Sequence, residues 1–386
     1  MAWEAWVAVV AGVLALGALV LGTVVWRRQR DLRGRLDPLP RRPTPDERPV
    51  VAVVVNPTKP GAHGLRETLA ESCARRGLDE PLWFETTAED PGVGQARDAL
   101  DRGADIVLAA GGDGTVRAVA EALTGTGVPM GLLPLGTGNL LARNLDLPLN
   151  DPAAALAVAL DGWDRPIDVG RLQVVRWATE QRGADPDAAD ATTPPASDEP
   201  GRSAPRRPPS EHLFLVIAGL GFDAAMVADA DEQLKAKVGW MAYFVAGIRH
   251  LHGRRLRVQV GLDDRPATST RLRSLLVGNC GRLPGGINLL PDAELDDGWL
   301  DVAAIDTRGG LAGWAQLLGE VVLQGIGLRN DLPAKIGRID HTRARTVRLA
   351  VVGGEHVQVD GEVLGRAEEL TASVDARALR VRVAHP

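Results

Sequence analysis

Residues 105–143 read DIVLAAGGDGTVRAVAEALTGTGVPMGLLPLGTGNLLAR, and this stretch decides the fold of the chain. Two apolar runs, 105–110 and 130–135, each predict a strand that ends in a glycine-rich turn and leads into a helix. The glycines allow backbone amides to approach an anion, and the helix N-terminus that follows favours negative charge. The pair of turns therefore predicts phosphate binding at the carboxyl edge of a parallel sheet. The alternative is that both are only tight turns between a strand and a helix.

The residues before this stretch predict the rest of an α/β domain. The β-branched run 50–55 is typical of a strand that is buried on both faces. Helical and strand-like segments then alternate up to residue 102, so the sequence predicts a doubly wound parallel sheet over residues 50–163. The loop after the first run carries Lys59, which fits a phosphate contact and an ordinary exposed loop lysine equally well.

The character of the sequence changes after Trp163. Short strand-like runs with turn signals follow one another, which predicts an antiparallel β-sandwich as the second domain, residues 164–386. Two predicted helices, at 237–252 and 311–326, interrupt these strands. Residues 178–210 are rich in Ala, Asp, Pro, Thr and Arg, and this composition predicts a disordered insertion.

An uncharged, apolar stretch begins at Ala5 and ends at Trp26. Its length, about 20 residues, is what a helix needs to cross a bilayer. Arginines follow it directly, so the positive-inside rule predicts a single-pass membrane protein with the rest of the chain in the cytoplasm. Residues 1–27 are therefore expected to form a transmembrane anchor, and residues 28–49 a basic, proline-rich linker. A cleaved signal peptide is the alternative, but its positive charge would precede the apolar core.

The composition of the chain argues against two classes of function. The formal net charge of −6 gives no support for a nucleic-acid partner. The two cysteines, Cys73 and Cys280, stand far apart and in no metal-binding or redox spacing. A disulfide framework or a zinc site is therefore not expected, and a reducing compartment fits the sequence.

Several short motifs follow one another along the chain in a fixed order. They are Gly111-Gly112-Asp113-Gly114-Thr115, Gly136-Thr137-Gly138-Asn139, Gly219-Leu220-Gly221-Phe222-Asp223-Ala224, Gly278-Asn279, Pro291-Asp292-Ala293, Asp296-Asp297-Gly298-Trp299-Leu300-Asp301 and Asp360-Gly361-Glu362. This ordered set resembles the diacylglycerol kinase catalytic-domain family, which includes bacterial diacylglycerol and lipid kinases and is related to sphingosine and ceramide kinases. The resemblance covers roughly residues 50–383. The first motif alone is shared with NAD kinases, whereas the ordered set is much more specific.

The resemblance implies an NAD kinase/diacylglycerol kinase-like fold, in which ATP and a lipid meet between an α/β domain and a β-sandwich. The last segment of such a chain can pack back on the first domain. The resemblance further implies that Asp113 is catalytic and linked to magnesium, and that Glu362 is the general base. It implies a structural magnesium site at Asp297 and at the backbone of Leu295 and Leu300. The residues implied in ATP binding are Asn56, Gly111, Gly112, Gly114, Thr115, Gly136, Thr137, Gly138 and Asn139.

The residues themselves leave alternatives open at two of these places. Asp360-Gly361-Glu362 is also the pattern of a turn between two hairpin strands, and Asp296-Asp297-Gly298 is also that of an ordinary loop turn. One position departs from the family pattern. Many bacterial relatives carry an acidic residue directly after the asparagine of the second turn, where this chain has Leu140. A magnesium network that runs through that acid is expected to be rearranged or absent.

We therefore expect an ATP-dependent, magnesium-using lipid kinase that transfers the γ-phosphate of ATP to a lipid hydroxyl. Diacylglycerol, which would give phosphatidic acid, is the first choice of acceptor. A kinase of another lipid, such as a sphingoid base or phosphatidylglycerol, is left open. So are an NAD kinase, a dinucleotide-dependent oxidoreductase and a catalytically silent, membrane-tethered lipid-binding protein. The expected partners are a membrane lipid and, through the stretch from Ala5 to Trp26, the bilayer; a homodimer is left open.

Overall fold

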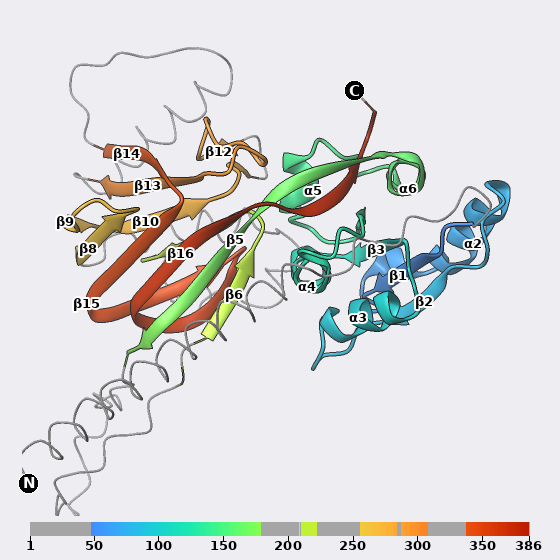
Figure 1. Ribbon diagram of the computed structural model, residues 1–386, viewed down its shortest axis with the longest axis horizontal. Helices are drawn as coiled ribbons and strands as arrows, with labels where there is room; N and C mark the ends of the chain where they lie inside the picture. Colours follow the sequence, from blue (N-terminus) through green and yellow to red (C-terminus); the bar gives the residue numbers. More distant parts are fainter. Residues whose placement is uncertain are drawn as a thin grey trace, which may run out of the picture. The chain divides into compact units, whose positions relative to one another are not determined.

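The computed structural model describes residues 48–178, 208, 210–221, 255–283, 287–307 and 337–385 (Figure 1). Several predicted segments lie outside these residues. They are the anchor 1–27, most of the linker 28–49 and of the insertion 178–210, and the helices at 237–252 and 311–326.

No helix within the described part of the chain is long and apolar enough to cross a membrane. The longest helices there, α2 (Leu65–Arg75) and α4 (Asp113–Leu123), have 11 residues each. A helix of that length spans only about 16 Å, whereas the hydrocarbon core of a bilayer is about 30 Å thick. The prediction of a single-pass membrane protein with its catalytic part in the cytoplasm is corrected by this finding. The stretch from Ala5 to Trp26 that carried the prediction lies outside the described residues.

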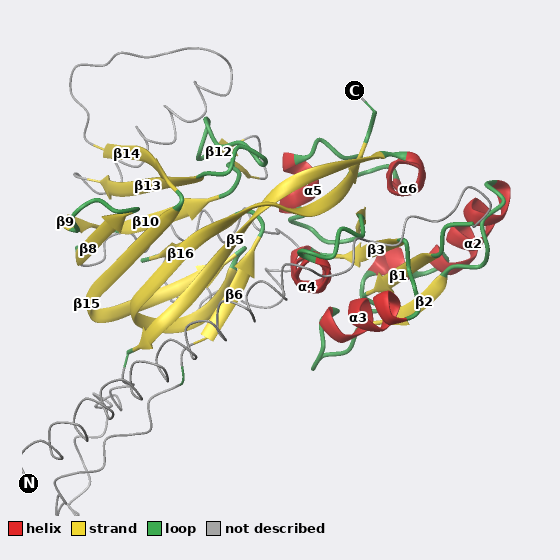
Figure 2. Ribbon diagram, viewed as in Figure 1, coloured by secondary structure: helices red, strands yellow, loops and turns green. Residues whose placement is uncertain are grey.

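The first part of the chain forms an α/β unit around a parallel sheet, as the sequence predicts (Figure 2). Strand β1 (Val51–Val55) pairs in parallel with β2 (Leu82–Glu85) and with β3 (Ile106–Gly111), and β3 pairs in parallel with β4 (Met130–Pro134). The helices of the described residues all belong to this unit. They are the 3-10 helix η1 (Pro60–Ala62), α2, α3 (Val93–Asp101), α4, α5 (Leu140–Asn144) and α6 (Pro152–Asp161).

Helices cover both faces of this sheet, which explains why β1 is apolar throughout. Ala52 and Val54 lie in one core cluster with residues of α3 and α4. Val51, Val53 and Val55 point to the opposite face and lie in a second cluster with residues of α2 and α6. Because successive side chains of a strand point to opposite faces, a strand between two helical layers needs a continuous apolar run. The prediction of a doubly wound α/β sheet is confirmed.

The second part of the chain is a β-sandwich built from antiparallel strands, as expected. Side chains such as Phe214, Leu220, Leu275 and Val347 form its core. The strands are β5 (Trp163–Trp177), β6 (Ser210–Phe214), β7 (Ile217–Leu220), β8 (Leu256–Leu262), β9 (Thr268–Leu272), β10 (Ser274–Gly278), β11 (Arg282–Leu283), β12 (Ile287–Asn288), β13 (Leu300–Thr307), β14 (Gly337–Ala344), β15 (Thr346–Val359) and β16 (Glu362–Val383).

Strand β16 joins the two parts into one hydrogen-bonded sheet. It runs antiparallel to β5 over most of its length, and near its end Val381 pairs in parallel with Met130 of β4. Among the described residues the sheet has 14 strands, in the order β14-β13-β10-β7-β15-β16-β4-β3-β1-β2, with β5, β6, β8 and β9 off this path. The domain boundary expected at residue 163 stays a prediction, although β5 does begin there.

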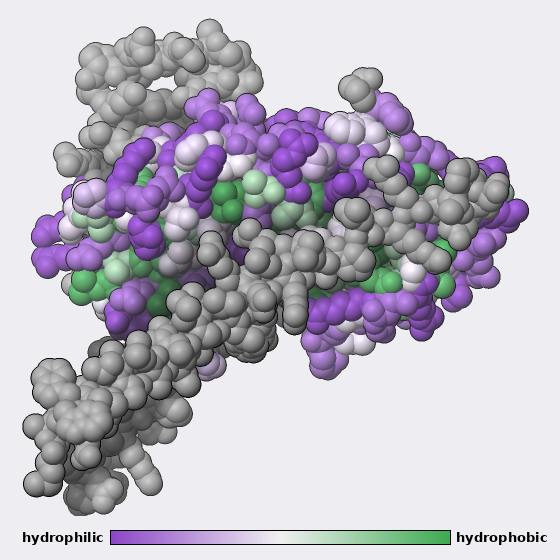
Figure 3. All heavy atoms as spheres, viewed as in Figure 1, coloured by the Kyte–Doolittle hydropathy of each residue, from purple (hydrophilic) through white to green (hydrophobic). Residues whose placement is uncertain are grey.

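The apolar side chains of the described residues lie almost entirely inside. On the face drawn in Figure 3, hydrophilic residues make up most of the coloured surface, and hydrophobic residues appear in smaller areas. Within the described part of the chain, the exposed large hydrophobic residues are Trp163, Val175 and Val352. The fold therefore buries its apolar residues in the two units that carry the candidate site.

Candidate functional site

The two glycine turns lie against each other at the carboxyl edge of the parallel sheet. Strands β3 and β4 are neighbours, and Gly111 at the end of β3 is paired with Pro134 at the end of β4. A Cβ atom on Gly136 would lie 2.6 Å from the Cα atom of Gly112, so the two backbones are in direct contact. A Cβ atom on Gly138 would lie 2.4 Å from a carboxylate oxygen of Asp113. Glycine at these places is required for the close approach of the turns.

Asp113, the first residue of α4, ties the first turn to the second. Its carboxylate accepts hydrogen bonds from the backbone amides of Asn139, at 3.0 Å, and Leu140, at 2.6 Å. Burial raises the pKa of Asp113, the charge of Asp360 raises it further, and the two backbone hydrogen bonds act in the opposite direction. The structure thus places a half-buried carboxylate, with a second one close by, directly at the glycine turns.

Asn139 closes the second turn on itself. Its side-chain oxygen accepts from the amide of Gly136 at 3.1 Å, and its side-chain nitrogen donates to the carbonyl of Gly136 at 2.7 Å. Its backbone lies in the left-handed region, with φ of 47°. Thr137 beside it is exposed. Asn139 therefore shapes the backbone of the turn, and Thr137 is the side chain of the turn that faces solvent.

The first turn has a similar division between buried and exposed residues. Thr115 is buried, and a Cβ atom on Gly111 would lie 2.6 Å from its side chain. Gly114 is exposed and has open space where a Cβ atom would be. Thr115 thus packs beneath the turn, and Gly114 presents its backbone to solvent, where an anion can approach.

The loop after β1 approaches the first turn. Asn56 folds this loop, since its side-chain oxygen accepts from the amide of Thr58 at 3.0 Å and from its hydroxyl at 2.7 Å. The side chain of Lys59 then passes near Gly112, with its Cε atom 3.9 Å from the place of a Cβ atom on that glycine. The structure therefore brings a lysine, which the sequence left undecided, to the edge of the glycine turns.

The Asp360-Gly361-Glu362 element is a tight turn between β15 and β16, and its aspartate is fully engaged. Asp360 and Gly361 have positive φ values of 46° and 88°. The half-buried Asp360 accepts, through its carboxylate, from three successive backbone amides, which belong to Leu215 at 2.8 Å and to Val216 and Ile217 at 2.9 Å. Burial raises the pKa of Asp360, while these three amides and the charge of Arg117 lower it.

Glu362 is exposed and forms an ion pair with Arg117 of α4. The same arginine donates a long hydrogen bond of 3.4 Å to the carbonyl of Val359, the last residue of β15. Arg117 was not singled out from the sequence. The sequence does contain a sign of its position. Arg117 follows Asp113 by four residues, so the two side chains lie on the same face of the helix. The structure brings Asp113, Asp360, Glu362 and Arg117 into one region.

Leu140, the position that departs from the family pattern, turns its side chain into the core. It is 1% exposed and belongs to the same cluster as the residues of α3 and α4. Its backbone amide donates the shorter of the two hydrogen bonds to Asp113. The residue thus supports the site through its backbone and offers no side-chain oxygen to a metal ion.

The contacts of Asp113 fit a magnesium ion that arrives with a nucleotide. Among the described residues, no group of three or more His, Cys, Asp or Glu side chains could hold a metal ion. Magnesium in nucleotide sites needs only one or two carboxylates, because it keeps water molecules and binds phosphate oxygens. Asp113, at the edge of the two turns, is the carboxylate that would hold such a cation.

At the expected structural magnesium site, which stays a prediction, the side chain of Arg343 lies beside Asp297. One oxygen of Asp297 accepts from the amide of Trp299 at 3.0 Å, and the other lies 3.2 Å from Nη1 of Arg343. Nε of Arg343 lies 3.2 Å from Asp301. The guanidinium also donates to the carbonyl of Asp292. A positive charge from the chain itself thus stands among these oxygens.

The two backbone groups expected at this site are part of the fold's own hydrogen bonding. The carbonyl of Leu295 accepts from the amide of Asp168 at 2.6 Å. Leu300 stands opposite Ala344 in the pairing of β13 with β14. These contacts connect the 291–299 loop to β5 and lead it into β13.

Two further buried polar residues connect this loop to the turn of Asp360. Asp168 is completely buried and accepts from the amides of Gly298, at 2.6 Å, and Arg377, at 2.7 Å. Asn279 donates from its side chain to the carbonyls of Asp168, at 2.8 Å, and Leu215, at 3.2 Å. Asp168 was not predicted, since one aspartate in an apolar strand pattern gives no sign of its partners.

A cavity of about 500 Å³ opens beside the second turn, between the end of α5 and the β11–β12 pair. Nε of Arg143 donates to the carbonyl of Gly138 at 2.7 Å, which connects the cavity to the turn. Its lining combines leucines with polar and charged side chains: Leu147, Leu149, Leu283, Arg143, Asp146, Arg282 and Asn288. A ligand with both a polar and an apolar part matches this lining.

Two family models match the chain, one on each part of the fold. Residues 50–172 match the diacylglycerol kinase catalytic domain. Residues 216–383 match the YegS C-terminal NAD kinase beta sandwich-like domain. The first match includes both glycine turns, and the second includes the turn of Asp360.

Known proteins resemble the chain over most of its length. A "Diacylglycerol kinase" of Mycobacterium tuberculosis is 30% identical over 75% of this chain and 79% of its own length. A "Probable lipid kinase YegS-like" of Pseudomonas aeruginosa is 32% identical over 83% of this chain and 90% of its own. The crystal structure of a diacylglycerol kinase from Bacillus anthracis has the same fold, with a TM-score of 0.62 and 19% identity over 88% of this chain and 98% of that one.

Proposed function

The chain belongs to the diacylglycerol kinase catalytic-domain family, and from that membership we propose that it transfers the γ-phosphate of ATP to a lipid hydroxyl, with diacylglycerol as the acceptor. Membership makes the chain a lipid kinase by class, and the family's chemistry implies ATP and a divalent metal. The product would be phosphatidic acid. One observation carries the proposal: two glycine turns meet backbone to backbone at the carboxyl edge of the sheet, and Asp113 bridges them.

Phosphoryl transfer requires positioning and charge neutralisation more than covalent chemistry by the protein. The exposed backbone at Gly114 and the N-terminus of α4 offer positive partial charge to the phosphates. Lys59 adds a full positive charge near Gly112. Magnesium, when bound with the nucleotide beside Asp113, would neutralise charge on the phosphate oxygens.

Glu362 is proposed as the general base. The acceptor hydroxyl forms a bond to the γ-phosphorus, the bond from that phosphorus to the oxygen shared with the β-phosphate breaks, and the hydroxyl proton passes to the Glu362 carboxylate. The exposure of Glu362 leaves room for an acceptor to reach it. Asp360, two residues before it, holds the turn through three amides, which keeps the backbone of Glu362 in place.

The cavity beside Arg143 is a suitable place for the acceptor. A diacylglycerol-like molecule has a polar end and apolar chains, and the lining leucines and guanidiniums can meet both. Sphingoid bases and phosphatidylglycerol share this division into a polar and an apolar part, so they belong in the same experiment.

The proposal is tested with purified full-length protein, ATP labelled at the γ-phosphate and Mg²⁺. The acceptors are diacylglycerol, a sphingoid base, phosphatidylglycerol and NAD, each supplied separately. We expect label in phosphatidic acid, and its loss in the Glu362→Gln protein. Label in another phosphorylated lipid would show that this lipid is the acceptor, and the proposed transfer of phosphate from ATP to a lipid hydroxyl would still hold. Label in NADP, or in none of the acceptors, would refute the proposal.

A further inference from the structure

Arg117, on helix α4, contacts the turn that carries Glu362. Its side chain is 18% exposed, whereas that of its ion-pair partner Glu362 is 62% exposed. A second contact reaches the carbonyl of Val359, the last residue of the strand before the turn. The arginine is thus enclosed by the protein, and the glutamate extends from a largely solvated position to meet it.

Arg117 lies on the same helix as Asp113, the residue that connects the glycine turns. Arg117 and Asp113 stand four residues apart on α4, so their side chains share one face of the helix. Asp113 in turn holds the second turn through the amides of Asn139 and Leu140. Helix α4 therefore carries both Asp113, which contacts the second turn, and Arg117, which contacts the carboxylate of Glu362.

Charge supports the same arrangement. Three carboxylates, those of Asp113, Asp360 and Glu362, lie in this region, and Arg117 acts on two of them. A guanidinium has five N–H donors in a fixed plane, so it can bind Glu362 and a carbonyl at the same time. A lysine has the charge but lacks this planar geometry.

We propose that Arg117 is a positioning residue that holds the Glu362 carboxylate where an acceptor hydroxyl meets the phosphate turns. The inference rests on the proposed function, in which Glu362 accepts the proton. A general base acts only within hydrogen-bond reach of the proton it takes. An exposed glutamate without a partner samples several rotamers, and an ion pair with an enclosed arginine selects one of them.

Kinetics with varied ATP and diacylglycerol test this role. In Arg117→Met we expect kcat to fall by about 10- to 100-fold, because the base loses its position, while the KM for ATP changes by less than about twofold. Arg117→Lys should recover part of the loss. In a Glu362→Gln background, Arg117→Met should have little further effect, since residues that act through one another are not additive.

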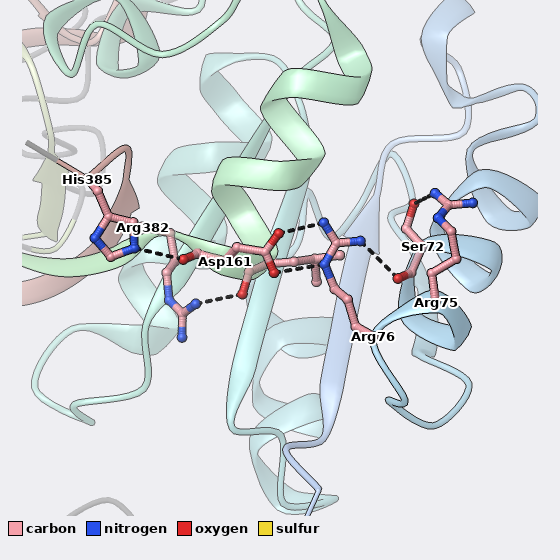
Figure 4. A network of polar contacts seen from close by, with 7 residues as sticks. Ser72, Arg75, Arg76, Asp161, Arg382 and His385 are labelled. Atoms are coloured by element: carbon pink, nitrogen blue, oxygen red, sulfur yellow. Dashed lines mark hydrogen bonds and ion pairs between the residues drawn. The ribbon is translucent and has the colours of Figure 1, made fainter.

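The matched control is Arg76→Met. Arg76 forms an ion pair with Asp161 at 2.5 Å, in a network that also includes Arg382 and His385 (Figure 4). This network lies at the C-terminal ends of α2 and α6, away from the carboxyl edge that carries the turns. Arg76→Met should leave kcat and KM unchanged. A rise of tenfold or more in the KM for ATP in Arg117→Met, with kcat intact, would overturn the proposal in favour of a direct phosphate contact. Unchanged kinetics would also overturn it.

A second measurement needs no turnover, so it separates this proposal from the proposed function. The double variant Arg117→Cys/Glu362→Cys is treated with dibromobimane, which joins two neighbouring thiols. The native Cys73 and Cys280 are buried and should not compete. We expect a cross-link in this variant and none in Arg76→Cys/Glu362→Cys. A wild type inactive on every acceptor would refute the proposed function, whereas a missing cross-link would refute the contact on which the role of Arg117 depends.

Discussion

The backbone amide of Leu140 donates a hydrogen bond of 2.6 Å to the carboxylate of Asp113. The two residues belong to different turns, and each begins a helix, α5 and α4. The carboxylate of Asp113 therefore holds the two turns together. In the family that the sequence resembles, many bacterial members carry an acidic residue at the position of Leu140. Here the side chain is buried, and the amide alone serves the site.

Replacing Asp113 should affect both catalysis and stability. Asp113→Asn removes the negative charge and keeps a carbonyl oxygen for only one of the two amides, because those of Asn139 and Leu140 donate to different carboxylate oxygens. The other amide then faces the side-chain NH2 group, so we expect the free energy of unfolding to fall by about 1–3 kcal/mol. We expect kcat to fall by at least about 100-fold, since the charge that faces the metal is lost. Steady-state kinetics and thermal unfolding measure the two effects.

The control for Asp113→Asn is Asp151→Asn. Asp151 caps α6 by accepting from the amide of Ala154 at 3.0 Å, and its substitution should leave turnover unchanged. Near-normal kcat in Asp113→Asn would show that the carboxylate has only the structural role.

Gly136→Ala should push the two turns apart. The new Cβ atom would meet the Cα atom of Gly112 at 2.6 Å, and backbone cannot move aside as a flexible side chain can. We expect a loss of about 1–3 kcal/mol in the free energy of unfolding and a rise in the KM for ATP. Gly114→Ala is the stability control, because open space surrounds that position. Denaturant unfolding that ranks Gly114→Ala as the more damaging change would contradict the packing described here.

Arg343 should make the 291–299 loop independent of metal ions. Its guanidinium stands between Asp297 and Asp301, so a chelator should not alter the unfolding temperature of the wild type. Arg343→Met leaves these carboxylates without a counter-charge. We expect this variant to unfold at a lower temperature and to regain stability when Mg²⁺ is added.

Arg176→Met is the matched control for Arg343→Met. Arg176 pairs with Glu368 at 2.8 Å and with Glu369 at 2.9 Å, and its loss should create no dependence on Mg²⁺. Thermal unfolding with and without Mg²⁺ decides the question. A wild type whose unfolding temperature drops on chelation would show that a metal ion is held at the loop after all.

Asp168 should make the free energy of unfolding depend on pH. Burial raises the pKa of Asp168 above its ordinary 3.8. Between 3.8 and the raised pKa the folded state binds more protons than the unfolded state, so stability increases as the pH falls through this window. Asp168→Asn lacks this group. The free energy of unfolding of the wild type, relative to the variant, should therefore rise from pH 7 towards about pH 4. Urea unfolding of both proteins across this range measures it, and a difference that shrinks as the pH falls would contradict the burial of an ionisable group.

The sequence predicts the framework of the site well, because local patterns determine it. Glycine turns, apolar runs and helical spacing are properties of neighbouring residues, and they gave the parallel sheet and its two turns. The partners of polar side chains, in contrast, could not be predicted from local patterns. Arg117 and Glu362 stand 245 positions apart, and no local pattern connects them. The aspartate of the Asp-Gly-Glu element was read as part of a turn, but its three amide donors come from residues 215–217.

The expected structural magnesium site stays a prediction, and its surroundings show the same dependence on distant residues. Asp297 and its neighbours carry the motif, but an arginine from β14, which begins 40 residues later, supplies the positive charge. A motif specifies the oxygens that a cation could use, and it does not specify which cation takes them. The membrane location was predicted from one apolar stretch, and it is corrected because no described helix has the length to span a bilayer.

The pairing of Val381 with Met130 has a consequence for how the protein is made. On a ribosome, β4 emerges about 250 residues before the part of β16 that lies beside it. At the usual speed of translation this interval lasts on the order of 10 to 50 s. During that time one edge of the nascent parallel sheet has no neighbour and is open to wrong pairing, by another chain or by a chaperone. The parallel sheet of the α/β unit is thus completed only when nearly the whole chain has been synthesised.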